Sequence, residues 1–253
     1  MRKYNSRPGL KLIDIGARKV SPTYGREAFM TFVEKGGNTM VFETDGERLV
    51  AHMLGFDPRV RRIQGQPFAV DLVEGLLLRT QEQRTAARRK YAKRKGASVY
   101  TPDFYVERVD GKQIVIEVKF GEFTGSDADH DRLKQASKVL ANYGHEVVRL
   151  ILPNVTHHPL RNNIGLLHAA AQRPDLFPSE RVIDRTSELA DGGARTLFDY
   201  ARGLELSVNV IPSLIVFGVL SIDLVAHHIE GRNPMRPAYG DLDHLALMER
   251  LLQ

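Results

Sequence analysis

The spacing of apolar and polar residues from residue 40 to residue 75 predicts a helix followed by strands. Apolar residues from Met40 recur at helical spacing and leave Glu43, Asp45 and Glu47 among the polar positions. The helix is expected to end at Asp57-Pro58, because the residue before proline is pushed out of the α region. One or two strands are expected next, at Val60, Ile63, Phe68, Val70, Leu72 and Val73.

A β-hairpin is the clearest local pattern in the chain. Two β-rich runs, 104–109 and 113–119, are joined by Asp110-Gly111. An Asp-Gly pair favours a tight turn in which both central residues have positive φ. Because side chains alternate along a strand, Glu117 and Lys119 are expected on one face of the second strand. The opposite face is then apolar and carries Ile114, Ile116 and Val118.

The elements after the hairpin complete a predicted α/β core. A helix capped by Ser126 or Asp127 is expected to end near Gly144, and a buried strand is expected at 147–152. A further helix is expected at 160–171. The order helix, strands, hairpin, helix, strand predicts a mixed α/β sheet covered by helices.

The sequence suggests three parts. Residues 1–40 are a loop-rich basic extension, and residues 41–170 are the core with a basic insertion at 75–96. Residues 171–253 are a small helical or winged-helix-like domain. Its helices are expected at 196–204, 210–218 and 242–252, and a short strand at 220–224.

Composition removes several classes of site. Cysteine is absent, so disulfides, thiolate zinc sites and a cysteine nucleophile are excluded, and any metal must bind oxygen or imidazole. No apolar run approaches the roughly 18 residues of a membrane helix, and the first residues lack a secretory pattern. We therefore expect a cytoplasmic protein with no membrane partner.

The basic charge is local. The formal net charge is +5, yet residues 79–95 hold eight basic residues and one acidic residue. Such a patch fits polyanion binding, since each neutralised phosphate releases counterions, although a solvated charged segment is the alternative. This segment is expected to be helical up to Gly96. The candidate DNA-backbone contacts are Arg84, Arg88, Arg89, Lys90, Lys93, Arg94 and Lys95, together with Arg59, Arg61 and Arg62.

Acidic residues and a lysine of the hairpin suggest a metal-dependent phosphodiesterase. Asp103 precedes the first strand, and pairing across the hairpin can bring it beside Glu117 and Lys119. Hydrolysis of a phosphodiester requires carboxylates for Mg²⁺ or Mn²⁺ and a cation near the attacking water. A lone Glu-x-Lys is usually the polar face of an ordinary strand. The additional Pro102-Asp103 and the upstream helix carrying Glu47 favour the metal site.

Four short blocks also carry a resemblance to a known family. They are residues 47–60, with Phe56-Asp57-Pro58 inside, then Gln66-Pro67, then 101–104 (Thr-Pro-Asp-Phe), then 116–119 (Ile-Glu-Val-Lys). In this order they resemble the TnsA family, the endonuclease subunit of a heteromeric transposase within the PD-(D/E)xK nuclease superfamily. The resemblance covers residues 40–153 well and is thin beyond them.

The resemblance implies a restriction-endonuclease-like fold and a set of roles. Glu47, Asp103 and Lys119 would be catalytic, and Glu117 a further metal ligand beside Glu47 and Asp103. The chain would cleave the 5′ ends of a transposon in double-stranded DNA, within the nucleoid of a bacterium. Its partners would be a DDE-type transposase and an AAA+ regulator ATPase.

Two other functions remain open at this point. A stand-alone restriction or repair nuclease with the same core would cut DNA without a transposase. A catalytically silent DNA-binding scaffold would keep the fold without cleavage. Retention of all four residues, Glu47, Asp103, Glu117 and Lys119, argues against the scaffold.

Overall fold

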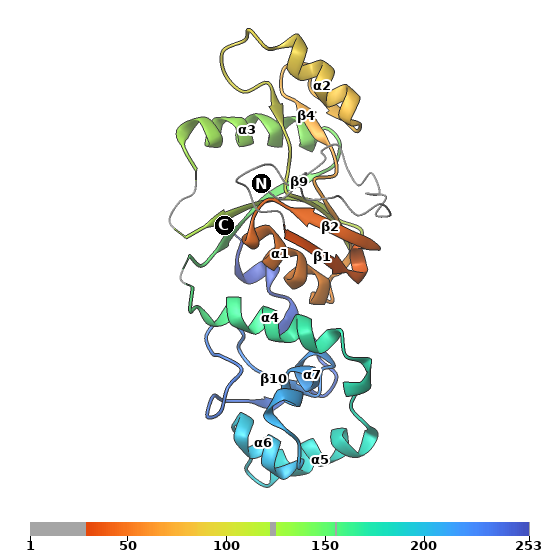
Figure 1. The fold of residues 1–253 in the computed structure, drawn as a ribbon, viewed down its shortest axis with the longest axis vertical. Coiled ribbons are helices and arrows are strands. Elements are labelled where there is room, and N and C mark those ends of the chain that lie inside the picture. Colours follow the sequence, from red (N-terminus) through yellow and green to blue (C-terminus); the bar gives the residue numbers. More distant parts are fainter. Residues whose placement is uncertain (1–28, 122–124, 155, 253) are drawn as a thin grey trace, which may run out of the picture.

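The computed structural model describes residues 29–121, 125–154 and 156–252 (Figure 1). It begins with an antiparallel hairpin, β1 (Phe29–Val33) and β2 (Asn38–Phe42), joined through a 3-10 turn. Helix α1 (Asp45–Phe56) follows, with Thr44 as its N-cap and Asp57 as its C-cap. The end of α1 was predicted, whereas the helical start at Met40 and the loop up to residue 40 were wrong. Residues 1–28 of the expected N-terminal extension lie outside the described residues.

A four-stranded mixed sheet forms the centre of the fold. Its order is β3-β7-β8-β9, in which only the β8–β9 pair is parallel. The parallel pair needs a crossover, which helix α3 (Asp127–Ala141) provides. The chain is therefore mixed α/β, as expected. The strands are β3 (Val60–Gly65), β7 (Phe104–Arg108), β8 (Gln113–Phe120) and β9 (Glu146–Leu152).

Helices cover both faces of this sheet. Ile114, Ile116 and Val118 of β8 belong to the large core that also contains buried residues of α1 and α4 (Pro159–Ala171). Val115 belongs to a second cluster, formed with the buried residues Leu133, Ala136 and Leu140 of α3. The alternation predicted for β8 is confirmed. The face that carries Glu117 is nevertheless packed against α3 and is not an open polar face.

The hairpin between β7 and β8 has a different turn from the one predicted. Gly111 has a φ of 84°, but Asp110 does not have positive φ. The Gly111 amide donates to the Arg108 carbonyl at 3.0 Å, and the Arg108 amide donates to the Lys112 carbonyl at 2.9 Å. The loop therefore has three residues, with only the last in the left-handed region, the arrangement of a three-residue hairpin.

The basic insertion folds into a small layer of its own. A three-stranded sheet of order β5-β4-β6 supports helix α2 (Gln81–Lys90), which ends five residues before the predicted limit of Lys95. Tyr91 turns the chain off the helix axis, because its ring packs on this layer and its hydroxyl donates to Asp71 at 3.1 Å. The strands are β4 (Ala69–Asp71), β5 (Leu76–Leu78) and β6 (Val99–Tyr100).

Residues 172–241, whose regular elements are mainly short helices, form a unit beyond α4 at the lower end of Figure 1. The helices expected at 196–204 and 210–218 are present in shorter form, and the predicted strand at 220–224 is reduced to two residues that pair with 236–237. Helix α5 was not predicted. The unit comprises α5 (Glu180–Asp191), α6 (Leu197–Gly203), α7 (Ile211–Val216), β10 (Leu220–Ser221) and β11 (Arg236–Pro237).

The segment 242–252 was expected to be a helix, but it forms two 3-10 turns that return to the central sheet. Leu245, Leu247 and Met248 are buried in the large core. The Ile151 amide donates to the Leu251 carbonyl at 3.1 Å, so the segment lies along β9. Burial of residues from several sides of the segment favours turns over one straight helix. Among the described residues, no helix is long and apolar enough to cross a membrane.

Candidate active site

Asp103 lies at the start of β7, where backbone hydrogen bonds hold it on two sides. Its amide donates to the Ile116 carbonyl at 3.2 Å, and its carbonyl accepts from the Gln66 amide at 2.9 Å. The Val118 amide donates to the Asp103 carboxylate at 2.8 Å. The side chain is half-buried. The hairpin thus aims the Asp103 carboxylate at the middle of β8.

Glu117 and Lys119 lie two residues apart on β8 and contact each other. The Lys119 ammonium is 2.8 Å from Oε1 of Glu117. Oε2 of Glu117 accepts a hydrogen bond from the Tyr100 hydroxyl at 2.7 Å. Glu117 is only 7% exposed, so both of its oxygens have a partner within a packed site. The structure therefore brings Asp103, Glu117 and Lys119 together, as the sequence predicted.

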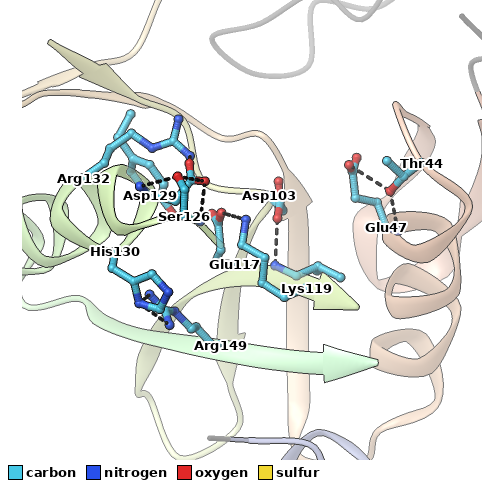
Figure 2. A network of polar contacts seen from close by, with 12 residues as sticks. Thr44, Glu47, Asp103, Glu117, Lys119, Ser126, Asp129, His130, Arg132 and Arg149 are labelled. Atoms are coloured by element: carbon cyan, nitrogen blue, oxygen red, sulfur yellow. Dashed lines mark hydrogen bonds and ion pairs between the residues drawn. The ribbon is translucent and has the colours of Figure 1, made fainter. Parts of the chain in front are cut away.

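Glu47 belongs to the first turn of α1 and is also part of its N-terminal cap. The Glu47 amide donates to the Thr44 hydroxyl at 3.1 Å. The Glu47 carboxylate accepts from the Thr44 hydroxyl at 3.0 Å and from the Glu43 amide at 3.1 Å. In Figure 2, Asp103 lies between Glu47 on one side and the Glu117–Lys119 pair on the other. Glu47 thus faces the site while it caps its helix.

The surroundings of Asp103 disfavour the ionised form of its carboxyl group. Burial raises the pKa of Asp103 well above its usual range, and the Glu117 and Glu47 carboxylates raise it further. The Val118 amide and Lys119 act in the opposite direction. Burial and Glu117 also raise the pKa of Tyr100, which remains a protonated hydrogen-bond donor. Acidic groups that repel one another in a buried site are typical of functional carboxylates.

The oxygen donors present fit a magnesium-type ion. Within the described ranges, no three acidic or histidine side chains are close enough to hold one metal ion by themselves. Mg²⁺ usually takes one or two protein carboxylates and completes its shell with water and substrate phosphate oxygens. Asp103 and Glu117 could supply those two carboxylates. Glu47 stands near enough to affect Asp103 but already holds two donors in its helix cap.

Some of the basic residues expected to contact DNA are buried or held in ion pairs within the protein, and the others are exposed. Arg84 is 4% exposed, so the expectation that it contacts DNA phosphates does not fit its burial. Arg59 forms ion pairs with Asp243, at 3.0 Å, and with Glu249, so it ties β3 to the C-terminal segment. Arg61 lies near Glu107 at 3.4 Å, and Lys90 pairs with Glu74. The exposed members are Arg61, Arg62, Arg88, Arg89, Lys90, Lys93, Arg94 and Lys95.

Two residues of the site were not singled out from the sequence for their roles. Tyr100 is 2% exposed and its hydroxyl donates to Glu117. Its position directly before Thr101-Pro102-Asp103 is the one sequence feature that could have suggested a place near the site. Gln66 has a φ of 44°, a strained value for a residue with a side chain, while its amide holds Asp103. Its buried Oε1 has no hydrogen-bond partner among the residues that the structure describes. No sequence pattern predicts such a backbone conformation at a glutamine.

Beside Glu117, the first turn of α3 adds a polar network. Asp129 accepts from the Ser126 hydroxyl at 2.8 Å and from Arg132 at 2.8 Å, which lowers its pKa. On β9, Arg149 lies opposite Glu117 in the parallel register and contacts His130 at 3.2 Å (Figure 2). The site therefore borders a polar network of both charges on the side of α3.

Comparisons with known proteins add nothing to this geometry. The chain matches no family model, and no curated protein matches it. Functional conclusions accordingly rest on the residues and their arrangement.

Proposed function

We propose that this chain is a Mg²⁺-dependent DNA endonuclease with a restriction-endonuclease-like core of the PD-(D/E)xK type. The observation that carries the proposal is the convergence of Asp103, Glu117 and Lys119 at one place on a mixed sheet, where Glu117 and Lys119 both affect the pKa of Asp103. Asp103 is fixed by the Val118 amide at 2.8 Å, and Lys119 contacts Glu117 at 2.8 Å. Two carboxylates and an ammonium are the groups that metal-assisted phosphodiester hydrolysis requires.

Each side chain has a role that follows from its chemistry. Asp103 and Glu117 would hold the metal ion through carboxylate oxygens, and Glu47 would add negative charge from the end of α1. When bound, the ion would polarise the scissile phosphate and lower the pKa of a coordinated water. Lys119 would orient the attacking water and offset negative charge that develops on the phosphate.

The resemblance to TnsA supports a more specific proposal. In that proposal the nuclease cuts the 5′ ends of a transposon, beside a DDE-type transposase and an AAA+ regulator. The unit that follows α4 would be the winged-helix-like domain that the sequence suggested for residues 171–253. The exposed bases of α2 and of the turn after it would hold the DNA backbone, together with Arg61 and Arg62. Arg59 and Arg84 are left out of this surface because of their contacts and burial.

The direct test is DNA cleavage by the purified full chain. Supercoiled plasmid or a fragment with transposon ends is incubated with Mg²⁺ or Mn²⁺, with and without the cognate transposase. Asp103→Ala and Lys119→Ala should abolish cleavage and leave the fold and DNA binding intact. Matched controls are Asp110→Ala and Lys112→Ala, at the exposed far end of the same hairpin, which should cut like the unmodified chain.

The outcomes separate the candidate functions. Metal-dependent cutting only in the presence of a transposase supports the transposon-end enzyme, and robust cutting by the chain alone supports a stand-alone nuclease. DNA binding without cleavage under any of these conditions would support the silent scaffold and overturn the proposal. Undiminished cutting by Asp103→Ala would remove this site from the mechanism.

A further inference from the structure

The hydrogen bond between Tyr100 and Glu117 joins the catalytic sheet to the layer that carries the basic helix α2. Tyr100 lies on β6, which pairs with β4 of the small three-stranded sheet. Its ring is 2% exposed and packs with Phe68 and Val115, and the Arg132 guanidinium lies 5.9 Å from the ring centre. A phenol so confined has little freedom to turn away from Glu117. Its hydroxyl is therefore a fixed donor to one oxygen of this carboxylate.

The two partners of Glu117 differ in how firmly they are held. Tyr100 donates to Oε2 from a buried, rigid ring, whereas Lys119 reaches Oε1 with a flexible side chain that is 19% exposed. A divalent cation and an ammonium group cannot share one carboxylate oxygen without strong repulsion. The hydroxyl of Tyr100 carries no charge, and it can stay on Oε2 when a cation approaches Oε1.

We infer that Tyr100 is a positioning residue, which holds the Glu117 carboxylate in a metal-ready orientation, and that metal binding displaces Lys119 from Oε1 of Glu117. This inference rests on the proposed nuclease function and adds two things to it. Metal affinity depends on a residue outside the sequence blocks that suggested a nuclease. Lys119, which contacts Glu117 in Figure 2, is freed to face water and phosphate only when the metal is present. Hydrogen bonds to a metal-ligating carboxylate commonly change metal affinity by about 10–100-fold.

The inference predicts opposite effects for the two partners of Glu117. Tyr100→Phe removes one hydroxyl and keeps the ring, so it should weaken Mn²⁺ binding by about 10-fold or more. At saturating Mn²⁺ its maximal cleavage rate should return to within about threefold of the unmodified chain, because Glu117 is then held by the metal. Lys119→Met should bind Mn²⁺ at least as tightly as the unmodified chain, because a competing cation is gone, and should not cleave.

The experiment measures Mn²⁺ binding to the full chain by titration calorimetry without DNA, and then cleavage across a Mn²⁺ series. The matched control is Tyr91→Phe, which removes another tyrosine-to-carboxylate hydrogen bond, to Asp71 at 3.1 Å, in the same layer but away from the site. It should leave Mn²⁺ affinity within twofold. In a Glu117→Gln background, adding Tyr100→Phe should change the remaining affinity little, because the hydroxyl acts through Glu117.

Two kinds of failure can be told apart. If the unmodified chain neither binds Mn²⁺ nor cleaves DNA, with or without the transposase, the proposed function fails and this inference fails with it. If the unmodified chain does both, and Tyr100→Phe binds Mn²⁺ equally well, only the inference is overturned. Equal losses in Tyr100→Phe and Tyr91→Phe would reduce Tyr100 to a general structural role, as would a lower maximal rate at unchanged affinity. Circular dichroism and melting curves of each variant show whether the fold is retained.

Discussion

Asp103→Asn should make the metal-free protein more stable while it abolishes metal binding. Burial and the Glu117 and Glu47 carboxylates raise the pKa of Asp103, so its ionised form is disfavoured in the fold. Asparagine has nearly the same shape, and its amide oxygen can still accept the Val118 hydrogen bond, which is 2.8 Å long. The substitution therefore removes the unfavourable charge with little loss of packing.

The size of this effect follows from the link between acidity and free energy. Each tenfold decrease in the acid dissociation constant of Asp103 on folding lowers the free energy of unfolding by about 1.4 kcal/mol when the group is ionised. In a protein of this size a gain of that amount raises Tm by roughly 3–6 °C. A metal present at 100 times its Kd would instead stabilise the unmodified chain by about 2.7 kcal/mol, and the variant should gain almost none of this.

Melting curves in EDTA and in excess Mn²⁺ provide the measurement. In EDTA the variant should melt above the unmodified chain, and in Mn²⁺ the order should reverse. Asp110→Asn, in the exposed hairpin turn, is the control and should follow the unmodified chain in both conditions. A variant less stable than the unmodified chain in EDTA would show that the charge of Asp103 is not disfavoured. Equal stabilisation of both proteins by Mn²⁺ would show that Asp103 does not hold the metal.

Four further predictions concern Gly46 in α1, Gly165 in α4, the basic residues in and after α2, and a histidine pair. Gly46→Ala should destabilise the fold by about 1–3 kcal/mol and disturb the adjacent Glu47, because a Cβ there would lie 1.7 Å from the tip of the Phe120 ring. Gly165→Ala, where a Cβ meets nothing within 4 Å, should instead stabilise by about 0.5–1 kcal/mol in urea unfolding. A variant with four exposed bases neutralised should bind DNA with a weaker salt dependence; the four are Arg88, Arg89, Lys93 and Arg94. The slope of log K against log salt should become less steep by up to about 3.6. An unchanged slope would show that these side chains face solvent and do not contact DNA phosphates. Burial, His168 and Arg48 lower the pKa of His52 from 6.5 to about 4, so its contribution to stability is present above pH 6.5 and is lost as the pH falls toward 4. Urea unfolding should show that the free energy of unfolding falls by at most about 2 kcal/mol between pH 7 and pH 5 because of His52. The His52→Gln variant should lack this decrease. An equal decrease in the variant and in the unmodified chain would contradict the prediction.

The parts of the fold that were predicted are those in which local pattern and tertiary packing agree. Helix α3 has a capping box at Ser126 and buries Leu133, Ala136 and Leu140 at helical spacing, so its limits followed from the sequence. The β7–β8 hairpin was found because alternation and a turn pair coincide. The proximity of Asp103 to Glu117 and Lys119 could be predicted from this hairpin, because strand pairing fixes which residues lie opposite each other.

The parts that were missed depend on contacts between distant segments. Residues 242–252 contain apolar positions compatible with a helix, but burial of Leu247 and Met248 and the Arg59–Glu249 ion pair bend them into turns. The β1–β2 hairpin was read as loop, although Phe29, Phe32 and Val33 precede the turn at Gly36-Gly37 and are β-prone. Burial of Arg84 in a helix of otherwise exposed bases, and the partnership of Tyr100 with Glu117, could be seen only in three dimensions.

The return of the C-terminal segment to β9 protects an open border of the central sheet. β9 is the last strand in the order β3-β7-β8-β9, and Leu252 pairs with Leu150 on its outer side. An unprotected border of this kind offers free amide and carbonyl groups to other chains and promotes aggregation. A fragment that stopped at residue 170 would keep Asp103, Glu117 and Lys119 but uncover this border, and self-association is its expected failure.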